Sequence, residues 1–209
     1  MKKNKTIRWL ILLAVVLGLA WFGYNALVGD YAPNQLQTPE TDNQTSNNTT
    51  ADKENTDTDA AESSAGTDEQ PQVAAVDCTV YDADGNAVKL SDYFGKPLVL
   101  NFWASWCGPC QSEMPDFQSV YAEYGEEVNF MMINLTDGSR ETTETALTFI
   151  NKNNYTFPVF FDTTLEATSA YGASTIPTTF IIDAEGYIVG YAKGPLDAET
   201  LTDTLSKLL

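Results

Sequence analysis

Hydrophobic and polar positions divide the chain into three stretches of different character. After four basic residues near the start, residues 9–28 form an almost unbroken apolar run. Residues 29–72 are rich in Asn, Thr, Asp, Glu, Ser and Gln, and they hold almost no large apolar side chain. Only residues 73–209 mix apolar and polar positions in the short periodic patterns of a folded domain. We therefore expect a single folded domain, preceded by an N-terminal apolar segment and a polar linker.

The first stretch, residues 1–28, is predicted to be an N-terminal signal anchor. A helix of about 20 residues spans the roughly 30 Å hydrocarbon core of a bilayer. A cleaved signal peptide ending at Gly18-Leu19-Ala20 is the alternative, but aromatic residues continue the apolar run beyond that point. All nearby basic residues precede the run. The pattern predicts a single-pass protein of the cell membrane, with a cytoplasmic N-terminus and an extracytoplasmic domain.

The second stretch, residues 29–72, is predicted to be a flexible acidic linker. It contains too few apolar side chains to offset the entropy lost on ordering. The whole chain has 29 acidic and 11 basic residues, and its formal net charge is −18. Such a charge argues against nucleic acid and anionic lipid headgroups as partners.

Strands and helices are predicted to alternate along residues 73–209. Apolar positions every three or four residues indicate helices, and Pro115 inside the first of them predicts a kink. This order of elements implies a layered α/β domain. The predicted strands are 78–81, 87–90, 98–104, 128–135, 158–162, 178–183 and 187–192, and the predicted helices are 91–94 (one short turn), 107–124, 141–151, 165–171 and 197–209.

The chain contains three cysteines, Cys78, Cys107 and Cys110, and no histidine. The absence of histidine excludes Ser-His-Asp and Cys-His catalysis and His-ligated haem, and three cysteines cannot form a four-cysteine zinc site. We therefore expect no metal. A disulfide between residues three apart adds little stability, which favours a redox role for Cys107 and Cys110. Cys78 lies in an alternating stretch and is predicted to be a buried small side chain, with a third redox thiol as the alternative.

The position of the Cys107–Cys110 pair explains how it would react. Cys-x-x-Cys alone is also compatible with half a metal site, but here it follows a buried strand and begins a helix. Unpaired N–H groups and the helix dipole stabilise a thiolate there. Cys107 is then the exposed nucleophile, and Cys110, on the same helix face, resolves the mixed disulfide. Gly108 allows a partner backbone to approach, and Pro109 stiffens the first turn.

Residues 101–110, Asn-Phe-Trp-Ala-Ser-Trp-Cys-Gly-Pro-Cys, resemble the active-site segment of thioredoxins. The wider sequence resembles the TlpA/ResA-like membrane-anchored branch, in Leu90-Ser91-Asp92, Gly95-Lys96-Pro97, Glu113-Met114-Pro115 and the extra helix at 141–151. The resemblance covers residues 76–209. It implies a thioredoxin-like fold with a central mixed sheet flanked by helices, and dithiol–disulfide exchange with no cofactor beyond the Cys pair.

The same resemblance implies roles for further residues. Thr175-Ile176-Pro177-Thr178 is similar to the loop that holds a cis-proline beside the Cys pair, and the backbone of Ile176 would pair with an extended substrate. Trp106, Gly108, Pro109 and Pro177 complete the expected substrate-binding surface. Glu113 is similar to an acidic residue that relays protons in the ResA-like branch, although a solvated surface glutamate is the alternative. Thioredoxins carry an aspartate where this chain has Asn101, which cannot titrate.

The function that the resemblance implies is reduction of disulfides in exported client proteins. Apocytochrome c, a methionine sulfoxide reductase or a peroxidase are candidate clients, and a CcdA-type membrane protein is the candidate electron donor. Gly-Pro between the cysteines is typical of reducing thioredoxins, whereas ResA has an acidic residue there. The alternatives are an oxidase that introduces disulfides and a non-catalytic binding domain with a thioredoxin-like fold.

Overall fold

The structure, a computed structural model, describes residues 35–38 and 72–209. The predicted anchor (1–28) and most of the predicted linker lie outside these residues. Within the two described ranges, no helix combines the length and apolar character needed to cross a bilayer.

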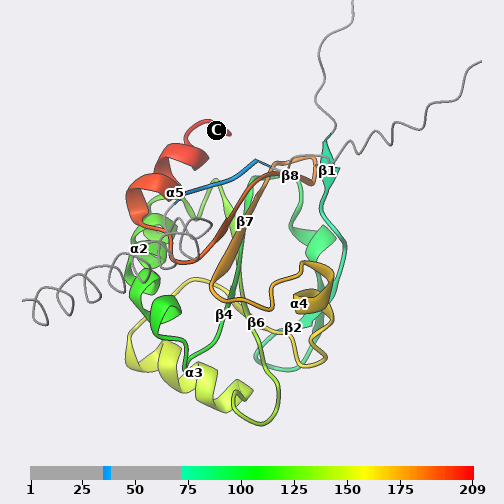
Figure 1. Cartoon of the computed structure of the whole chain (residues 1–209), viewed down its shortest axis with the longest axis vertical. Coiled ribbons are helices and arrows are strands. Elements are labelled where there is room, and N and C mark those ends of the chain that lie inside the picture. The colour runs from blue at the N-terminus through cyan, green and yellow to red at the C-terminus, as the bar shows by residue number, and fades with distance from the viewer. Residues whose placement is uncertain (1–34, 39–71) are drawn as a thin grey trace, which may run out of the picture.

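A mixed sheet of eight strands forms the centre of the domain (Figure 1). Its spatial order is β1-β8-β7-β4-β5-β6-β2-β3. β4 lies in the interior, parallel to β5 and antiparallel to β7. The strands are β1 (Val73–Ala74), β2 (Thr79–Tyr81), β3 (Ala87–Lys89), β4 (Leu98–Trp103), β5 (Asn129–Asn134), β6 (Val159–Phe161), β7 (Thr178–Ile182) and β8 (Tyr187–Lys193).

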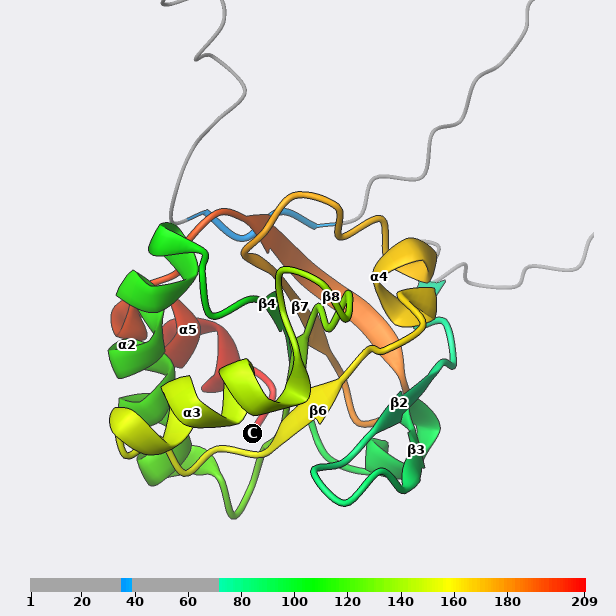
Figure 2. The same cartoon turned by 90° about the horizontal axis from the view of Figure 1, so that it is seen from below.

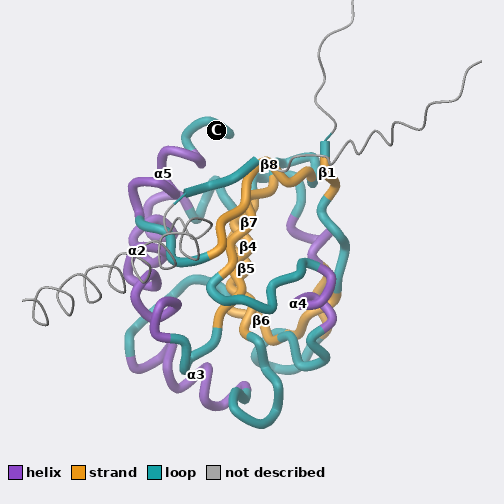
Figure 3. The backbone as a smooth tube through the Cα atoms, viewed as in Figure 1, coloured by secondary structure: helices purple, strands orange, loops and turns teal. Residues whose placement is uncertain are grey.

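Helices cover both faces of the sheet (Figures 2 and 3). On one face lie α2 (Gly108–Tyr124), α3 (Thr143–Lys152) and α5 (Ala198–Leu205). On the other lie α4 (Glu166–Ala170) and the short 3₁₀ helix η1 (Leu90–Tyr93). The predicted thioredoxin-like arrangement of helices around a central mixed sheet is confirmed.

β4 explains why the domain has two separate cores. Every residue of this strand is buried, as expected for an interior strand that is covered on both faces. Val99 and Trp103 pack in the cluster under α2, α3 and α5, whereas Leu100 and Phe102 pack in the cluster on the opposite face. β4 ends at Trp103 and α2 begins at Gly108, so Cys107 lies at the junction between the central strand and this helix.

Several element boundaries differ from the sequence prediction. α3 begins at Thr143 rather than 141, because Thr142 caps it by accepting a hydrogen bond from the backbone N–H of Thr145. α5 ends at Leu205, earlier than the predicted 209. Pro115 lies inside α2, which is one continuous helix from Gly108 to Tyr124. The two-residue strand β1, which pairs with β8, is absent from the prediction.

Part of the predicted linker lies against the sheet. Residues 35–38 pass along the outer edge of β8, where Gln37 forms an antiparallel β-bridge with Tyr191. Sequence composition assigned these residues to the flexible linker and did not predict the contact.

Candidate active site

Cys107 and Cys110 form a disulfide at the start of α2, with their Cα atoms 5.2 Å apart. Cys107 is the N-cap of the helix, and its sulfur accepts a 3.3 Å hydrogen bond from the backbone N–H of Cys110. Pro109 occupies the first turn, as predicted. Cys107 is only 5% exposed and Cys110 is fully buried, so the prediction of an exposed Cys107 is wrong for this disulfide form, in which both cysteines pack into the core under α2. A thiolate at Cys107 would therefore sit at the positive end of the helix dipole.

Exposed residues surround this sulfur on the surface. Trp106 is 40% exposed, and Gly108 and Pro109 are exposed as well. A Cβ atom built at Gly108 would meet no atom within 4 Å, so the surface is open there. The structure thus brings three of the predicted substrate-binding residues to the surface beside Cys107.

The loop before β7 forms the other side of the pair. The Ile176–Pro177 peptide bond is cis, as the resemblance implied. Pro177 is buried and Ile176 is half-buried, and the Ile176 carbonyl oxygen lies 3.7 Å from the Cys107 sulfur. Trp106, Gly108 and Pro109 are therefore neighbours of the two cysteines along the chain. Ile176 and Pro177 belong to the loop that contacts Cys107.

Glu113 is buried one helical turn beyond Cys110, with 1% of its surface exposed. Its Oε1 atom accepts a hydrogen bond of 2.9 Å from Asn101 Nδ2, and its Oε2 atom accepts one of 3.0 Å from the backbone N–H of Leu196. Burial raises the pKa of Glu113 to about 8, although these two hydrogen bonds oppose the shift. The alternative prediction of a solvated surface glutamate is wrong.

Asn101 holds Glu113 from the central strand. Its Nδ2 atom also donates a 3.0 Å hydrogen bond to the Thr179 hydroxyl, which links β4 to β7 beneath the site. Both residues are fully buried. Asn101 thus serves as a neutral support for the glutamate, in keeping with its inability to titrate.

A second buried carboxylate, Glu141, was missed by the sequence analysis, which assigned it to the start of a helix. It is fully buried and accepts hydrogen bonds from the Ser105 N–H (2.9 Å), the Ser105 hydroxyl (2.7 Å) and Asn134 Nδ2 (2.8 Å). Glu141 therefore fixes the loop between β4 and Cys107. The helix cap at Thr142 is the local signal that could have placed Glu141 outside the helix.

Arg140, next to Glu141, contacts the surface of the site. Its guanidinium carbon lies 3.5 Å from the centroid of the Trp106 ring, within the range of a cation–π interaction. The Asp137 carboxylate accepts hydrogen bonds from the backbone N–H groups of Ser139, Arg140 and Glu141, which lower the pKa of Asp137. The loop after β5 is thereby folded against Trp106.

Cys78 lies apart from the pair, in the hydrophobic cluster on the opposite face of the sheet. It is 5% exposed and is a free thiol. Burial, with additional repulsion from Asp162, Asp77 and Glu166, raises its pKa to about 12. The prediction of a buried small side chain is confirmed.

Comparison with known proteins places this arrangement in a family. The model of the AhpC/TSA family matches residues 71–191. The chain belongs to the AhpC/TSA family. Within this family it is similar to the thiol-disulfide oxidoreductase ResA of Bacillus thuringiensis subsp. konkukian, with 34% identity over 130 residues that cover 62% of this chain and 73% of ResA. The sporulation thiol-disulfide oxidoreductase A of Bacillus subtilis is 34% identical over 137 residues, covering 65% and 81%.

Solved structures of similar proteins agree with the fold. The crystal structure of StoA from Bacillus subtilis superposes with a TM-score of 0.54 at 32% identity, covering 64% of this chain and 98% of StoA. A DsbF homologue from Corynebacterium diphtheriae gives a TM-score of 0.60 at 28% identity, covering 71% and 98%. The predicted resemblance to the ResA-like branch is confirmed, and the protein is a thiol–disulfide oxidoreductase of this type.

Proposed function

We propose that the protein is a membrane-tethered, extracytoplasmic reductase of disulfides in exported proteins, with Cys107 as the attacking thiol. One observation carries this proposal. Cys107 caps α2 between the exposed residues Trp106 and Gly108 and is itself 5% exposed, whereas Cys110 (0%) and the titratable Glu113 (1%) lie further inside along the helix. This asymmetry supports one sulfur for attack and one for release.

The reaction begins with the reduced pair. The Cys107 thiolate attacks one sulfur of a client disulfide, and a Cys107–client bond forms as the second client sulfur leaves as a thiolate. Cys110 then loses its proton and attacks the Cys107 sulfur. The Cys107–Cys110 disulfide forms, and the first client sulfur leaves as a second thiolate. The client gains two electrons and the pair loses two.

Glu113 would accept the proton that Cys110 loses during release of the client. Both side chains are buried on α2 and lie three positions apart, so they share one face of the helix. With its pKa raised to about 8, the Glu113 carboxyl can take up or give up a proton near physiological pH. The hydrogen bonds from Asn101 and Leu196 hold the carboxyl in place while it does so.

The client would bind across the exposed residues beside Cys107. Its backbone would pair with Ile176 in extended form, and Gly108 leaves room for the chain to approach Cys107. Trp106 and Pro109 would supply apolar contacts on the surface. The Ile176 carbonyl oxygen lies 3.7 Å from the Cys107 sulfur, where a bound client would meet both.

Two features of the sequence support the reducing direction and the membrane location. Gly108 and Pro109 form the dipeptide of reducing thioredoxins, and the apolar run at 9–28 suits a membrane anchor. Because the outside lacks the cytosolic thiol pools, electrons must be resupplied across the membrane, and the donor that we propose is a membrane-embedded carrier of the CcdA type. Apocytochrome c, or a reductase or peroxidase with a disulfide, is the expected kind of client.

Trapping tests these roles. In a Cys78→Ala background, Cys110→Ala should accumulate mixed disulfides between Cys107 and clients, because the release step is lost. Cys107→Ala in the same background should accumulate none. Equal trapping by both variants would contradict the assignment of the nucleophile.

The redox potential of the pair tests the direction. A potential close to that of thioredoxin, about −270 mV, supports a reductase, whereas one close to about −120 mV supports an oxidase. The measurement uses glutathione or dithiothreitol buffers and the intact chain in detergent. A strongly oxidising potential would contradict the proposed reductase and support the oxidase. The exchange chemistry of the Cys pair would be unaffected.

A further inference from the structure

The outer edge of β8 is shared by two segments from different parts of the chain. β1 covers Tyr187 and Ile188 only. Further along the same edge, the backbone N–H of Gln37 donates to the Tyr191 carbonyl at 2.6 Å, and the Tyr191 N–H donates to the Gln37 carbonyl at 2.7 Å. Gln37 therefore adds a single antiparallel bridge to this edge, and residues 35–38 lie along β8 in the manner of a short added strand.

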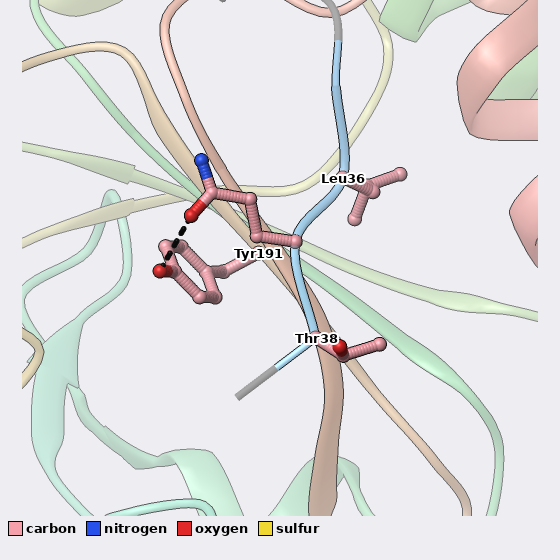
Figure 4. A pocket seen from close by; sticks show the side chains of 4 residues that line it. Leu36, Thr38 and Tyr191 are labelled. Carbon is pink, nitrogen blue, oxygen red and sulfur yellow. Dashed lines mark hydrogen bonds between the residues drawn. The ribbon is translucent and has the colours of Figure 1, made fainter. Parts of the chain in front are cut away.

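Side chains on both faces of residues 35–38 contact the domain. The Tyr191 hydroxyl donates a 2.7 Å hydrogen bond to the Gln37 side-chain oxygen (Figure 4). On the other side, Leu36 packs against the core cluster under α2 and α5. A Cβ atom at Gly190 would lie 2.9 Å from Leu36 Cδ2, so this glycine makes room for Leu36. The alternation of Leu36 and Gln37 matches the pleat of a strand.

The direction of this segment places its N-terminal end near the Cys pair. The bridge is antiparallel, so the chain runs from Gln37 back to Gln35 toward the Lys193 end of β8. At that end, Lys193 pairs with Thr178, which directly follows Pro177. The chain on the N-terminal side of Gln35 thus meets the domain at its catalytic end.

We propose that Gln35–Thr38 is a docking strand that holds the domain close to the bilayer with the Cys107–Cys110 end facing it. This proposal rests on the membrane anchoring proposed above. At about 3.5 Å per extended residue, the 44 residues from 29 to 72 reach at most about 150 Å. When the strand is docked, only the six residues 29–34 separate anchor and domain, a reach of about 20 Å.

Docking would present the Cys pair to a dithiol partner embedded in the same membrane. The short tether raises the local concentration of the pair at the bilayer, and the direction of the strand turns the reactive end toward the partner. Clients further from the membrane would be reached when the strand is released and the full linker is free to extend.

Hydrogen exchange on the full chain in nanodiscs tests the docking itself. Gln37→Pro removes the N–H that bonds to Tyr191, whereas Gln44→Pro makes the same change outside the docking strand. The Tyr191 amide should exchange at least tenfold faster in Gln37→Pro and at the wild-type rate in Gln44→Pro. Equal exchange in all three proteins would overturn the proposal.

Energy transfer to labelled lipid headgroups tests the orientation. A dye is attached through an unnatural amino acid at Ser139, on the loop at the catalytic end, or at Glu127, at the opposite end of the domain. Transfer from position 139 should exceed transfer from 127, and Gln37→Pro should lower transfer from 139 at least twofold. Gln44→Pro should not.

The outcomes separate the two proposals. If the wild-type chain stays in the nanodisc but positions 139 and 127 transfer equally, or Gln37→Pro changes nothing, the docking strand does not orient the domain and the anchoring stands. If the wild-type chain does not remain in the nanodisc, the membrane tether and the orientation both fail.

Discussion

The Glu113 carboxylate accepts a 3.0 Å hydrogen bond from the backbone N–H of Leu196, 83 residues further along the chain. This bond ties α2 to the segment that precedes α5, directly behind the disulfide. Asn101 fixes the other carboxylate oxygen from β4. A titratable group is thereby held rigidly in a buried position where its protonation affects both stability and chemistry.

The stability of the domain should depend on the charge of Glu113. Its folded pKa of about 8 exceeds the ordinary value of 4.5, so the folded state retains a proton that the unfolded state releases. Wild-type stability is therefore lost as pH rises through this window, at about 1.4 kcal/mol per unit. Glu113→Gln lacks this loss. The free energy of unfolding of the variant minus that of wild type should therefore increase by about 3 kcal/mol from pH 4.5 to pH 7.

Urea unfolding of the oxidised protein at several pH values measures this difference. Glu123→Gln, a change at an exposed position on the same helix, serves as the control and should follow the wild type. A constant difference between Glu113→Gln and wild type across the window would contradict the raised pKa.

Release of the client should slow when Glu113 cannot titrate. In Glu113→Gln we expect Cys110 to resolve a mixed disulfide about 10²-fold more slowly at pH 7, because proton transfer by a positioned group contributes about that much. The pH profile of this step should also lose its inflection near pH 8. Acid quenching and mass spectrometry of the Cys107–peptide adduct follow the reaction. An unchanged rate and profile would remove Glu113 from the mechanism.

Cys78 should be almost inert in the folded protein. Its pKa of about 12, compared with an ordinary 9.0, leaves about 10³-fold less thiolate at pH 8. Iodoacetamide should alkylate it at least about 10³-fold more slowly than a free cysteine, and urea should abolish this protection. Rapid alkylation of the native protein would show that the thiol is accessible. Cys78→Ala should keep full disulfide-exchange activity.

Glu141 should be required for stability. Glu141→Ala leaves the Ser105 N–H and Asn134 Nδ2 without their buried acceptor, and such a loss costs about 3 kcal/mol. Glu144→Ala, at an exposed position two residues into α3, should cost less than about 1 kcal/mol. Denaturant midpoints compare the two variants. Equal midpoints would show that the loop before Cys107 does not depend on Glu141.

The best sequence predictions concern elements whose pattern is local. The apolar run of β4 and the three- and four-residue spacing of α2 predicted both elements, and with them the position of Cys107 at a strand-to-helix junction. Patterns of this kind depend on which face of an element is buried, which the sequence records directly.

Features that depend on distant residues were not predictable in the same way. The burial of Glu113 depends on Leu196, and that of Glu141 on Ser105, 36 residues before it. The resemblance to the ResA-like branch indicated a role for Glu113, whereas the burial of Glu141 was not predicted. Gln37 lies in a stretch of linker-like composition, and its pairing with Tyr191 depends on an edge of β8 that β1 leaves uncovered.

The central claim is that Cys107 and Cys110 exchange two electrons as one unit. The most direct test is redox titration of the purified chain in dithiothreitol buffers, with the oxidised and reduced cysteines identified by mass spectrometry. We predict a single reversible two-electron transition between the Cys107–Cys110 disulfide and the dithiol, with Cys78 remaining a thiol throughout. Absence of a reversible bridge between Cys107 and Cys110, or its replacement by a bridge to Cys78, would contradict the account.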